Sequence, residues 1–309
     1  MTLQQLEYVL ALDKYRHFAK AADACKVTQP TLSSMIQKLE EELGLKIFDR
    51  RRQPIAPTQA GRVVIRHARD VLHEARNLRS AVEEDRHSLA GTFTIGVLPT
   101  IAPYLLPRFL PHLLNEHQEM DVRVIEMKTS VMKKALADSA IDAAIMAKVE
   151  GLEGLQLTTL YYEQFYAYVS SNDPLFSHQV VKTTDFSNDF LWLLDEGHCF
   201  RDQLVKFCQL PAAVQSKKTY SLGSIETFMR MVESGKGVTF IPELAVHQLS
   251  DRQRLLVRPF ALPIPMREIV MAVTDDFFRR TLLDFLVNNI QNSVPREMLK
   301  PLQTARIVL

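Results

Sequence analysis

The sequence predicts an α/β protein in two parts: a small helical unit that ends in a long helix, followed by a larger unit with two lobes. Three observations predict this fold class. Apolar residues up to Gly44 recur at helical spacing and are interrupted by one tight connection. A long amphipathic pattern begins at Thr58, and from Gly91 onward short apolar runs alternate with helical patterns.

The composition is that of an ordinary soluble globular protein, with 47% hydrophobic and 24% charged residues among 309. No apolar run reaches the roughly 18 residues of a membrane span. Glu7 and Asp13 also lie where a signal peptide needs an uncharged core. We therefore expect a cytoplasmic protein with no membrane partner. In such a compartment a disulfide is more often catalytic or redox-sensing than structural.

Two helices joined by a tight turn follow the first N-terminal helix. The apolar positions from Phe18 to Cys25 give the first of the two an inward face, and we expect Cys25 to be a buried core residue. The turn falls at residues 26–28, and Pro30 suits the opening of the next helix because its missing N–H needs no partner there. The inward positions of that helix are Leu32, Ile36 and Leu39.

The opposite face of the same helix carries short polar side chains, namely Gln29, Thr31, Ser33, Ser34 and Gln37. Amide and hydroxyl groups of this kind bind phosphates and base edges in the major groove of double-stranded DNA. Solvent exposure alone would also explain polar residues, but it does not explain why so few of them are charged. We therefore predict that this face binds DNA.

A short wing and a long helix complete the N-terminal part. Arg50, Arg51 and Arg52 form a run of positive charge next to Pro54, and we expect this wing to contact phosphates, although a solvated turn would have the same composition. An apolar stripe then recurs every three or four residues from Val64 to Val82. Such a stripe most simply pairs with the same stripe of a second copy, so that a dimer reads a two-fold-related DNA site.

The second part predicts a parallel α/β arrangement in two lobes. Its first set of strands and helices begins at Gly91, and a second set begins near Tyr162. The segment EIVMAVT near residue 270 and the helix TLLDFLVNNI would return to complete the first lobe. Ligands of such folds bind at strand ends and between lobes, so Thr100, Thr129 and the GHC segment should converge there.

Two cysteines, Cys199 and Cys208, lie on one predicted helix because Leu204, Val205 and Phe207 recur at helical spacing. Nine residues of helix separate their Cα atoms by about 13.5 Å. A disulfide requires Cα atoms within roughly 7 Å, so it could form only if this helix came apart. A zinc site would need closer spacing and more ligands than the adjacent His198, and we predict no metal or cofactor.

The segment AADACKVTQPTLSSMIQKLEEELGLKIFDR, followed by PTQAG, resembles the LysR-type transcriptional regulators. The resemblance implies a winged helix-turn-helix, a linker helix and a periplasmic-binding-protein-like effector domain. It also implies a homo-oligomer, a dimer of dimers, that works with RNA polymerase. The implied DNA contacts are Gln29, Pro30, Thr31, Ser33, Ser34 and the wing arginines. We place the DNA-binding domain at 1–58, the linker helix at 59–90 and the effector domain at 91–309, with lobes at 91–162 plus 268–309 and at 163–267.

Within this family, GHCFRDQ, a cysteine nine residues after the first, and the helix SIETFMRMVESGKGVTFIPELAV resemble the peroxide-sensing members. The resemblance implies that hydrogen peroxide is the signal, that Cys199 is the peroxidatic cysteine and that Cys208 resolves it into a disulfide. Further residues implied to shape the peroxide pocket are Thr100, Thr129, His198 and Arg267. A regulator of this kind activates oxidative-stress genes, and a thiol-disulfide reductase resets it.

The chemistry requires Cys199 to become a thiolate, so we expect donors and positive charge around it. A helix starting near Phe200 would direct N–H groups at the sulfur, and His198, Arg201 or Arg267 could add charge or donors. The sulfenic acid product would be trapped by a second thiol, Cys208. Cys208 could equally be a core residue, since it lies between Phe207 and Leu210.

Other functions remain open on the same residues. The regulator could respond to a metabolite between the lobes, with both cysteines incidental, and Thr129 could simply cap a helix. A thiol peroxidase is a third reading, but an enzyme needs no DNA-binding unit, so we expect the protein not to be an enzyme.

Overall fold

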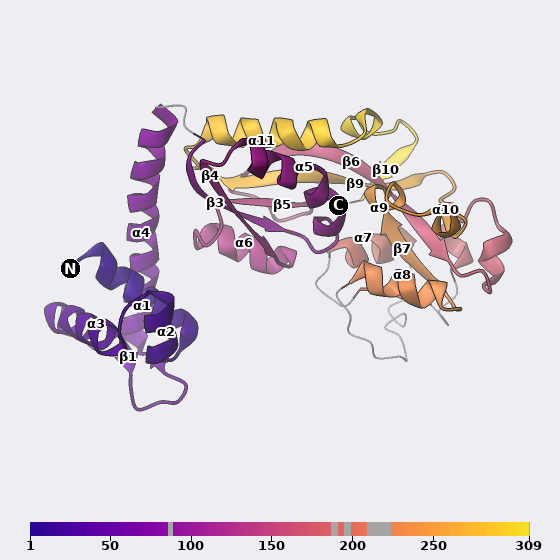
Figure 1. The fold of residues 1–309 in the computed structure, drawn as a ribbon. Coiled ribbons are helices and arrows are strands. Elements are labelled where there is room, and N and C mark those ends of the chain that lie inside the picture. Colours follow the sequence, from indigo (N-terminus) through magenta and orange to yellow (C-terminus); the bar gives the residue numbers. More distant parts are fainter. Residues whose placement is uncertain (86–88, 187–190, 195–198, 209–223, 309) are drawn as a thin grey trace. The chain divides into compact units, whose positions relative to one another are not determined.

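The computed structural model describes residues 1–309 except 86–88, 187–190, 195–198, 209–223 and 309. The chain forms two units, Met1–Arg86 and His87–Leu309 (Figure 1), and each unit has its own hydrophobic core. Within the described ranges, every helix is either too short or too polar to cross a membrane.

The first unit contains helices and one short hairpin. Its elements are α1 (Leu3–Tyr15), α2 (Phe18–Ala24), α3 (Gln29–Leu43), β1 (Phe48–Asp49), β2 (Ala56–Pro57) and α4 (Gln59–Asp85). Thr28 caps α3 by accepting a hydrogen bond from the Thr31 N–H, and Gly44 ends α3 in the left-handed conformation, at φ +66°. The predicted order of helix, turn and helix is therefore confirmed.

The core of this unit contains the predicted inward residues of α3, and Leu32, Ile36 and Leu39 are all fully buried. Cys25 differs from its prediction because it is only partly buried. It lies just beyond the end of α2 and packs against the edge of the core instead of its centre.

Among the residues of helix α4 whose burial is described, those buried in the core of the first unit lie in its N-terminal half. Ile65 and Ala68 are buried there, whereas Leu78 and Val82 farther along the helix are exposed, at 71% and 47%. The apolar stripe predicted for this helix thus continues beyond the part that packs within the chain.

The second unit is built around a sheet. Its strands are β3 (Gly91–Val97), β4 (Met120–Glu126), β5 (Ala143–Ala147), β6 (Leu155–Val169), β7 (Val238–Pro242), β8 (Val257–Pro259), β9 (Ile264–Thr274) and β10 (Ala305–Ile307). Its helices are α5 (Ala102–Glu116), α6 (Thr129–Ala137), α7 (Cys199–Cys208), α8 (Ile225–Glu233), α9 (Glu243–Val246), α10 (Asp251–Arg254) and α11 (Arg280–Ser293), with 3-10 turns at Pro174–Ser177, Thr183–Asp185 and Arg296–Leu299.

The strand order is β4-β3-β5-β9-β6-β7, with β10 beside β9 and β8 beside β6. Strand β3 is parallel to β4 and β5, as predicted, but β9 is antiparallel to β5 and β6, so the sheet is mixed and not purely parallel. The antiparallel pairs arise because β9 returns from the far end of the sequence and inserts between β5 and β6.

Strand β6 begins earlier than the sequence predicts, at Leu155 and not near Tyr162. It is one strand of 15 residues that pairs with β9 over its first part and with β7 and β8 over its last residues. Strands β6 and β9 therefore both run from one lobe to the other. The segment FLWLLDE supplies only an isolated bridge from Leu191 to Val238 among its described residues.

Candidate redox and DNA-binding sites

The exposed face of α3 carries the polar residues that the sequence predicts for DNA binding. Ser33 is partly exposed, and the exposed members of the set are Gln29, Pro30, Thr31, Ser34 and Gln37. All lie on one helix whose opposite face is in the core. The face is therefore free, within this unit, to enter a groove of DNA.

The three wing arginines are exposed, and Arg50 is held beside α3. Its Nη1 donates to the Ser33 hydroxyl and its Nη2 to Glu40 Oε2, each at 3.3 Å. Arg52 pairs with Asp49 at 3.4 Å, and the Arg51 side chain has no ion-pair partner in the described part of the chain. Arg51 is thus the wing cation with the least charge compensation.

Glu40 was not singled out from the sequence, although it fixes the wing. It is 2% exposed, and its Oε1 accepts hydrogen bonds from the backbone N–H groups of Ile47 and Phe48 at 2.8 and 3.2 Å. Glu40 follows the buried Leu39, so helical spacing could have indicated that Glu40 is buried as well. It was missed because it begins a run of three glutamates, Glu40–Glu42, which suggests an exposed segment.

Cys199 is the first residue of α7 and is 7% exposed. Burial is the largest influence and raises the pKa of its thiol. A hydrogen bond with the Thr129 hydroxyl, the charge of Arg267 and the N–H of Phe200 lower it, while Asp202 raises it, and the net pKa is above the usual value. Of the predicted groups, the Phe200 N–H and Arg267 act on the sulfur, but the resting group is a thiol because desolvation outweighs them.

A pocket of about 590 Å³ adjoins this thiol. It lies between α6, the end of β5 and α7, and its lining residues are Thr129, Ser130, Lys133, Val149, Glu150, Cys199, Asp202, Gln203 and Lys206. One buried polar atom of this lining, Gln203 Oε1, has no hydrogen-bond partner among the described residues. The pocket therefore offers an unused hydrogen-bond acceptor near the Cys199 thiol.

Thr100 and Arg267 are brought together, but they do not line this pocket. Arg267 is completely buried, and its Nη1 and Nη2 donate to Thr100 Oγ1 and to the Thr100 carbonyl oxygen, each at 3.2 Å. The guanidinium carbon lies 4.9 Å from the centre of the Phe200 ring, a cation–π distance. Arg267 thus acts on Cys199 through its charge and through the residue that follows Cys199.

Residues 3–62 match the family model for the bacterial regulatory helix-turn-helix protein of the lysR family, and residues 86–293 match the LysR substrate binding domain. The chain belongs to the LysR family. Members of this family are DNA-binding transcriptional regulators, and the two matches together confirm the resemblance noted in the sequence.

Individual relatives are similar over most of the LysR-family chain. The hydrogen peroxide-inducible genes activator of Dickeya chrysanthemi is 35% identical over 271 residues, 88% of each chain. The crystal structure of OxyR from Porphyromonas gingivalis is 48% identical, with a TM-score of 0.66, and covers 71% of this chain and 100% of that one. Full-length OxyR C199D from Pseudomonas aeruginosa is 32% identical, with a TM-score of 0.77, and covers 98% of this chain and 99% of that one.

Cys208 ends α7 in this LysR-family protein, and its thiol is 6% exposed. Burial alone raises its pKa to about 12. Cys25, Cys199 and Cys208 are all free thiols. The ten residues of α7 hold Cys199 and Cys208 at opposite ends, with Cα atoms about 13.5 Å apart at helical rise.

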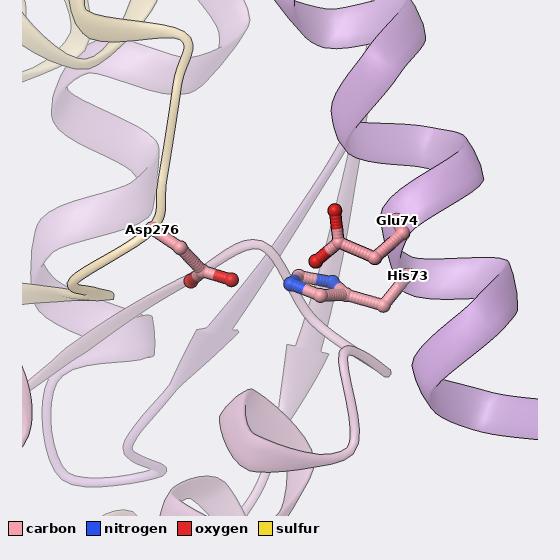
Figure 2. A group of neighbouring side chains, drawn as sticks. All are labelled: His73, Glu74 and Asp276. Carbon is pink, nitrogen blue, oxygen red and sulfur yellow. The ribbon is translucent and has the colours of Figure 1, made fainter. Parts of the chain in front are cut away.

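His198 lies outside the described residues. Figure 2 labels His73 and Glu74 on α4, and Asp276 in the turn after β9. The side-chain nitrogen of Asn77 lies 3.0 Å from His73 Nε2 and 3.5 Å from Glu74 Oε1. His73 and Glu74 belong to the first unit and Asp276 to the second, and no metal site is assigned to them.

Proposed function

We propose that this LysR-family protein binds double-stranded DNA and senses hydrogen peroxide through oxidation of Cys199, which activates oxidative-stress genes. The observation that carries the proposal is the Cys199 thiol, which lines a pocket where a hydroxyl, a backbone N–H and the charge of Arg267 act on it. The similarity to an activator of hydrogen peroxide-inducible genes from Dickeya chrysanthemi supports it.

The first step oxidises Cys199. Its thiol loses the proton, and the sulfur attacks one oxygen of hydrogen peroxide, so that an S–O bond forms and the O–O bond breaks. The leaving oxygen takes a proton and departs as water. The Thr129 hydroxyl, the Phe200 N–H and Arg267 stabilise the anionic sulfur, and the product is a sulfenic acid.

The second step joins the two cysteines. The Cys208 sulfur attacks the Cys199 sulfur, the S–O bond breaks, and the hydroxyl group leaves as a second water with the proton of Cys208. Cα atoms about 13.5 Å apart must come within roughly 7 Å for this bond. Helix α7 must therefore unwind, and Phe200 and Leu204, which are buried in the core beside the two cysteines, must leave these positions.

The refolded segment would alter how two effector domains pack, and the linker helices would carry that change to the DNA-binding units. The exposed apolar residues Val71, Leu78 and Val82 of α4 support pairing of this helix with a second copy. The full proposal includes a dimer of dimers, action on RNA polymerase and reset by a thiol-disulfide reductase in the cytoplasm.

The test uses reduced full-length protein and one equivalent of hydrogen peroxide. We expect two thiols to disappear and peptide mapping to find Cys199 linked to Cys208. Cys199→Ser should lose the response, and Cys208→Ser should stop at a sulfenic acid that dimedone traps. The matched control is Cys25→Ser, which should respond like the wild type.

A second candidate function is a response to a small metabolite. The pocket volume of about 590 Å³ supports it, because small-molecule sites span roughly 300–1,000 Å³ and peroxide fills little of this space. If two free thiols remained at 199 and 208 after peroxide treatment, this candidate would replace the peroxide sensor.

A further inference from the structure

Glu163 and Arg267 face each other across the two strands that join the lobes. They are register partners in the antiparallel pair of β6 and β9, with side chains 1% and 0% exposed. Opposite charges at directly paired positions of neighbouring strands attract each other. Glu163 Oε1 accepts from Arg267 Nε at 2.8 Å and lies 2.6 Å from Arg267 Nη2. One carboxylate oxygen therefore holds two nitrogens of the guanidinium.

The other contacts of the guanidinium lead to the redox helix. Thr100 accepts hydrogen bonds from both terminal nitrogens, and the rings of Phe200 and Phe165 lie 4.9 and 5.8 Å from the guanidinium carbon. Phe200 follows Cys199, and its backbone N–H lowers the pKa of the Cys199 thiol. The guanidinium held by Glu163 thus contacts Phe200 in the first turn of α7.

Few charged or titratable groups act on Glu163 and on Cys199. Tyr104 of α5, Tyr161 of β6, Glu243 of α9 and Arg267 of β9 act electrostatically with Glu163. Cys199 is influenced by Arg267, by Asp202 of its own helix and by the Thr129 hydroxyl of α6. Arg267 is the one cation in these two sets with an influence on Cys199, and its only ion-pair partner within the described ranges is Glu163.

We infer that Glu163 is a positioning residue of the redox site, which fixes Arg267 between Thr100 and Phe200 and compensates part of the charge that Arg267 exerts on Cys199. The inference rests on the proposed function, because it gives Glu163 control over how readily the sensor cysteine reacts. A carboxylate within hydrogen-bond distance of a buried guanidinium offsets much of its field at a third group. Loss of the carboxylate should therefore make Cys199 more reactive.

The test measures the reactivity of one thiol against pH. Full-length protein with Cys25→Ser and Cys208→Ser carries Cys199 alone, and its alkylation by iodoacetamide is followed from pH 6 to 11. Glu163→Gln keeps the shape and removes the charge, and we expect the midpoint to fall by about one pH unit, which is about tenfold faster alkylation near pH 7. Glu163→Asp keeps the charge and should stay near the parent profile.

A matched control removes a neighbouring carboxylate that does not bind Arg267. Glu243 accepts hydrogen bonds from Gln164 at 2.9 and 3.3 Å, and Glu243→Gln should leave the Cys199 profile unchanged. A folded Glu163→Gln protein with the parent profile would overturn the inference. A purely structural role for Glu163 would lower stability without moving the midpoint of alkylation.

Removing one partner of a buried ion pair leaves the other charge unpaired, so a second comparison includes a double variant that removes both charges. Arg267→Gln and the double variant Glu163→Gln/Arg267→Gln should have the same Cys199 profile, because Glu163 acts through Arg267. A difference between these two profiles would also overturn the inference. Reaction with hydrogen peroxide is measured separately: if the profiles shift as expected while peroxide oxidises no thiol, the proposed function fails and the positioning role stands.

Discussion

The buried thiol of Cys208 should be almost inert in the reduced protein. Burial raises its pKa from the ordinary 9.0 to about 12, so the thiolate fraction at neutral pH is about a thousandfold smaller than in an unfolded chain. The thiolate is the nucleophile in alkylation, and its rate follows this fraction. We therefore expect Cys208 in the folded protein to react with iodoacetamide about a thousandfold more slowly than in urea.

The assay uses Cys25→Ser/Cys199→Ser protein, in which Cys208 is the remaining thiol, and mass spectrometry counts adducts over time at pH 7.5. The rate in buffer should rise about tenfold per pH unit up to about pH 11, because the folded pKa lies above that range. Local opening of α7 sets a lower limit on the rate. A Cys208 that reacted equally fast in buffer and in urea would refute the argument that burial keeps it protonated.

Three further predictions concern DNA binding, the C-terminal strand and the redox helix. Arg51→Ala should weaken DNA binding for all sequences and reduce the salt slope by about one, measured by fluorescence anisotropy between 50 and 200 mM salt; an unchanged slope would place Arg51 away from phosphates. Gln203→Leu removes the hydrogen bond from Gln203 Nε2 to the Val308 carbonyl oxygen at 2.7 Å. Urea denaturation should show a free energy of unfolding lower by about 1 kcal/mol, and limited proteolysis should cut the C-terminus more readily. Leu204→Ala removes a fully buried side chain of α7 and should lower the free energy of unfolding by about 2–5 kcal/mol. It should also speed disulfide formation, without changing dimedone trapping in Cys208→Ser protein. The control is Leu282→Ala, at an equally buried position, which should change stability alone.

Local patterns predicted the DNA-binding unit well. The turn at residues 26–28, the place of Pro30 at the opening of α3 and the inward residues of α3 all depend on neighbours within one or two helical turns. Helix α7 was predicted for the same reason, and the structure places Cys199 and Cys208 at its two ends. Spacing along the chain contains this information directly.

Pairings between distant residues could not be read in the same way. Strand β9 inserts between β5 and β6, and Glu163 meets Arg267 across 104 positions of sequence. Gln203 binds Val308 across 105 positions, although the tail that contains Val308 has no recognisable motif. Such contacts depend on sheet order, which hydrophobic patterning does not specify.

The electrostatic expectation for Cys199 was incomplete for a related reason. Sequence identified the donors beside the sulfur, but not the degree of burial that several elements impose together. Desolvation acts against every charged form, so a thiol can be surrounded by favourable groups and still keep its proton.

The stability of helix α7 determines how readily Cys199 and Cys208 could form a disulfide. A helix of ten residues is marginal by itself in water, so α7 depends on its contacts with the rest of the domain. Burial of Phe200 and Leu204 contributes about 1.5–3 kcal/mol each, and the hydrogen bond of Gln203 about 1 kcal/mol. A total on the order of 5 kcal/mol keeps the open helix at about one molecule in several thousand. Oxidised Cys199 would capture that rare open form as a disulfide, whereas reduced Cys199 forms no bond there and the helix closes again.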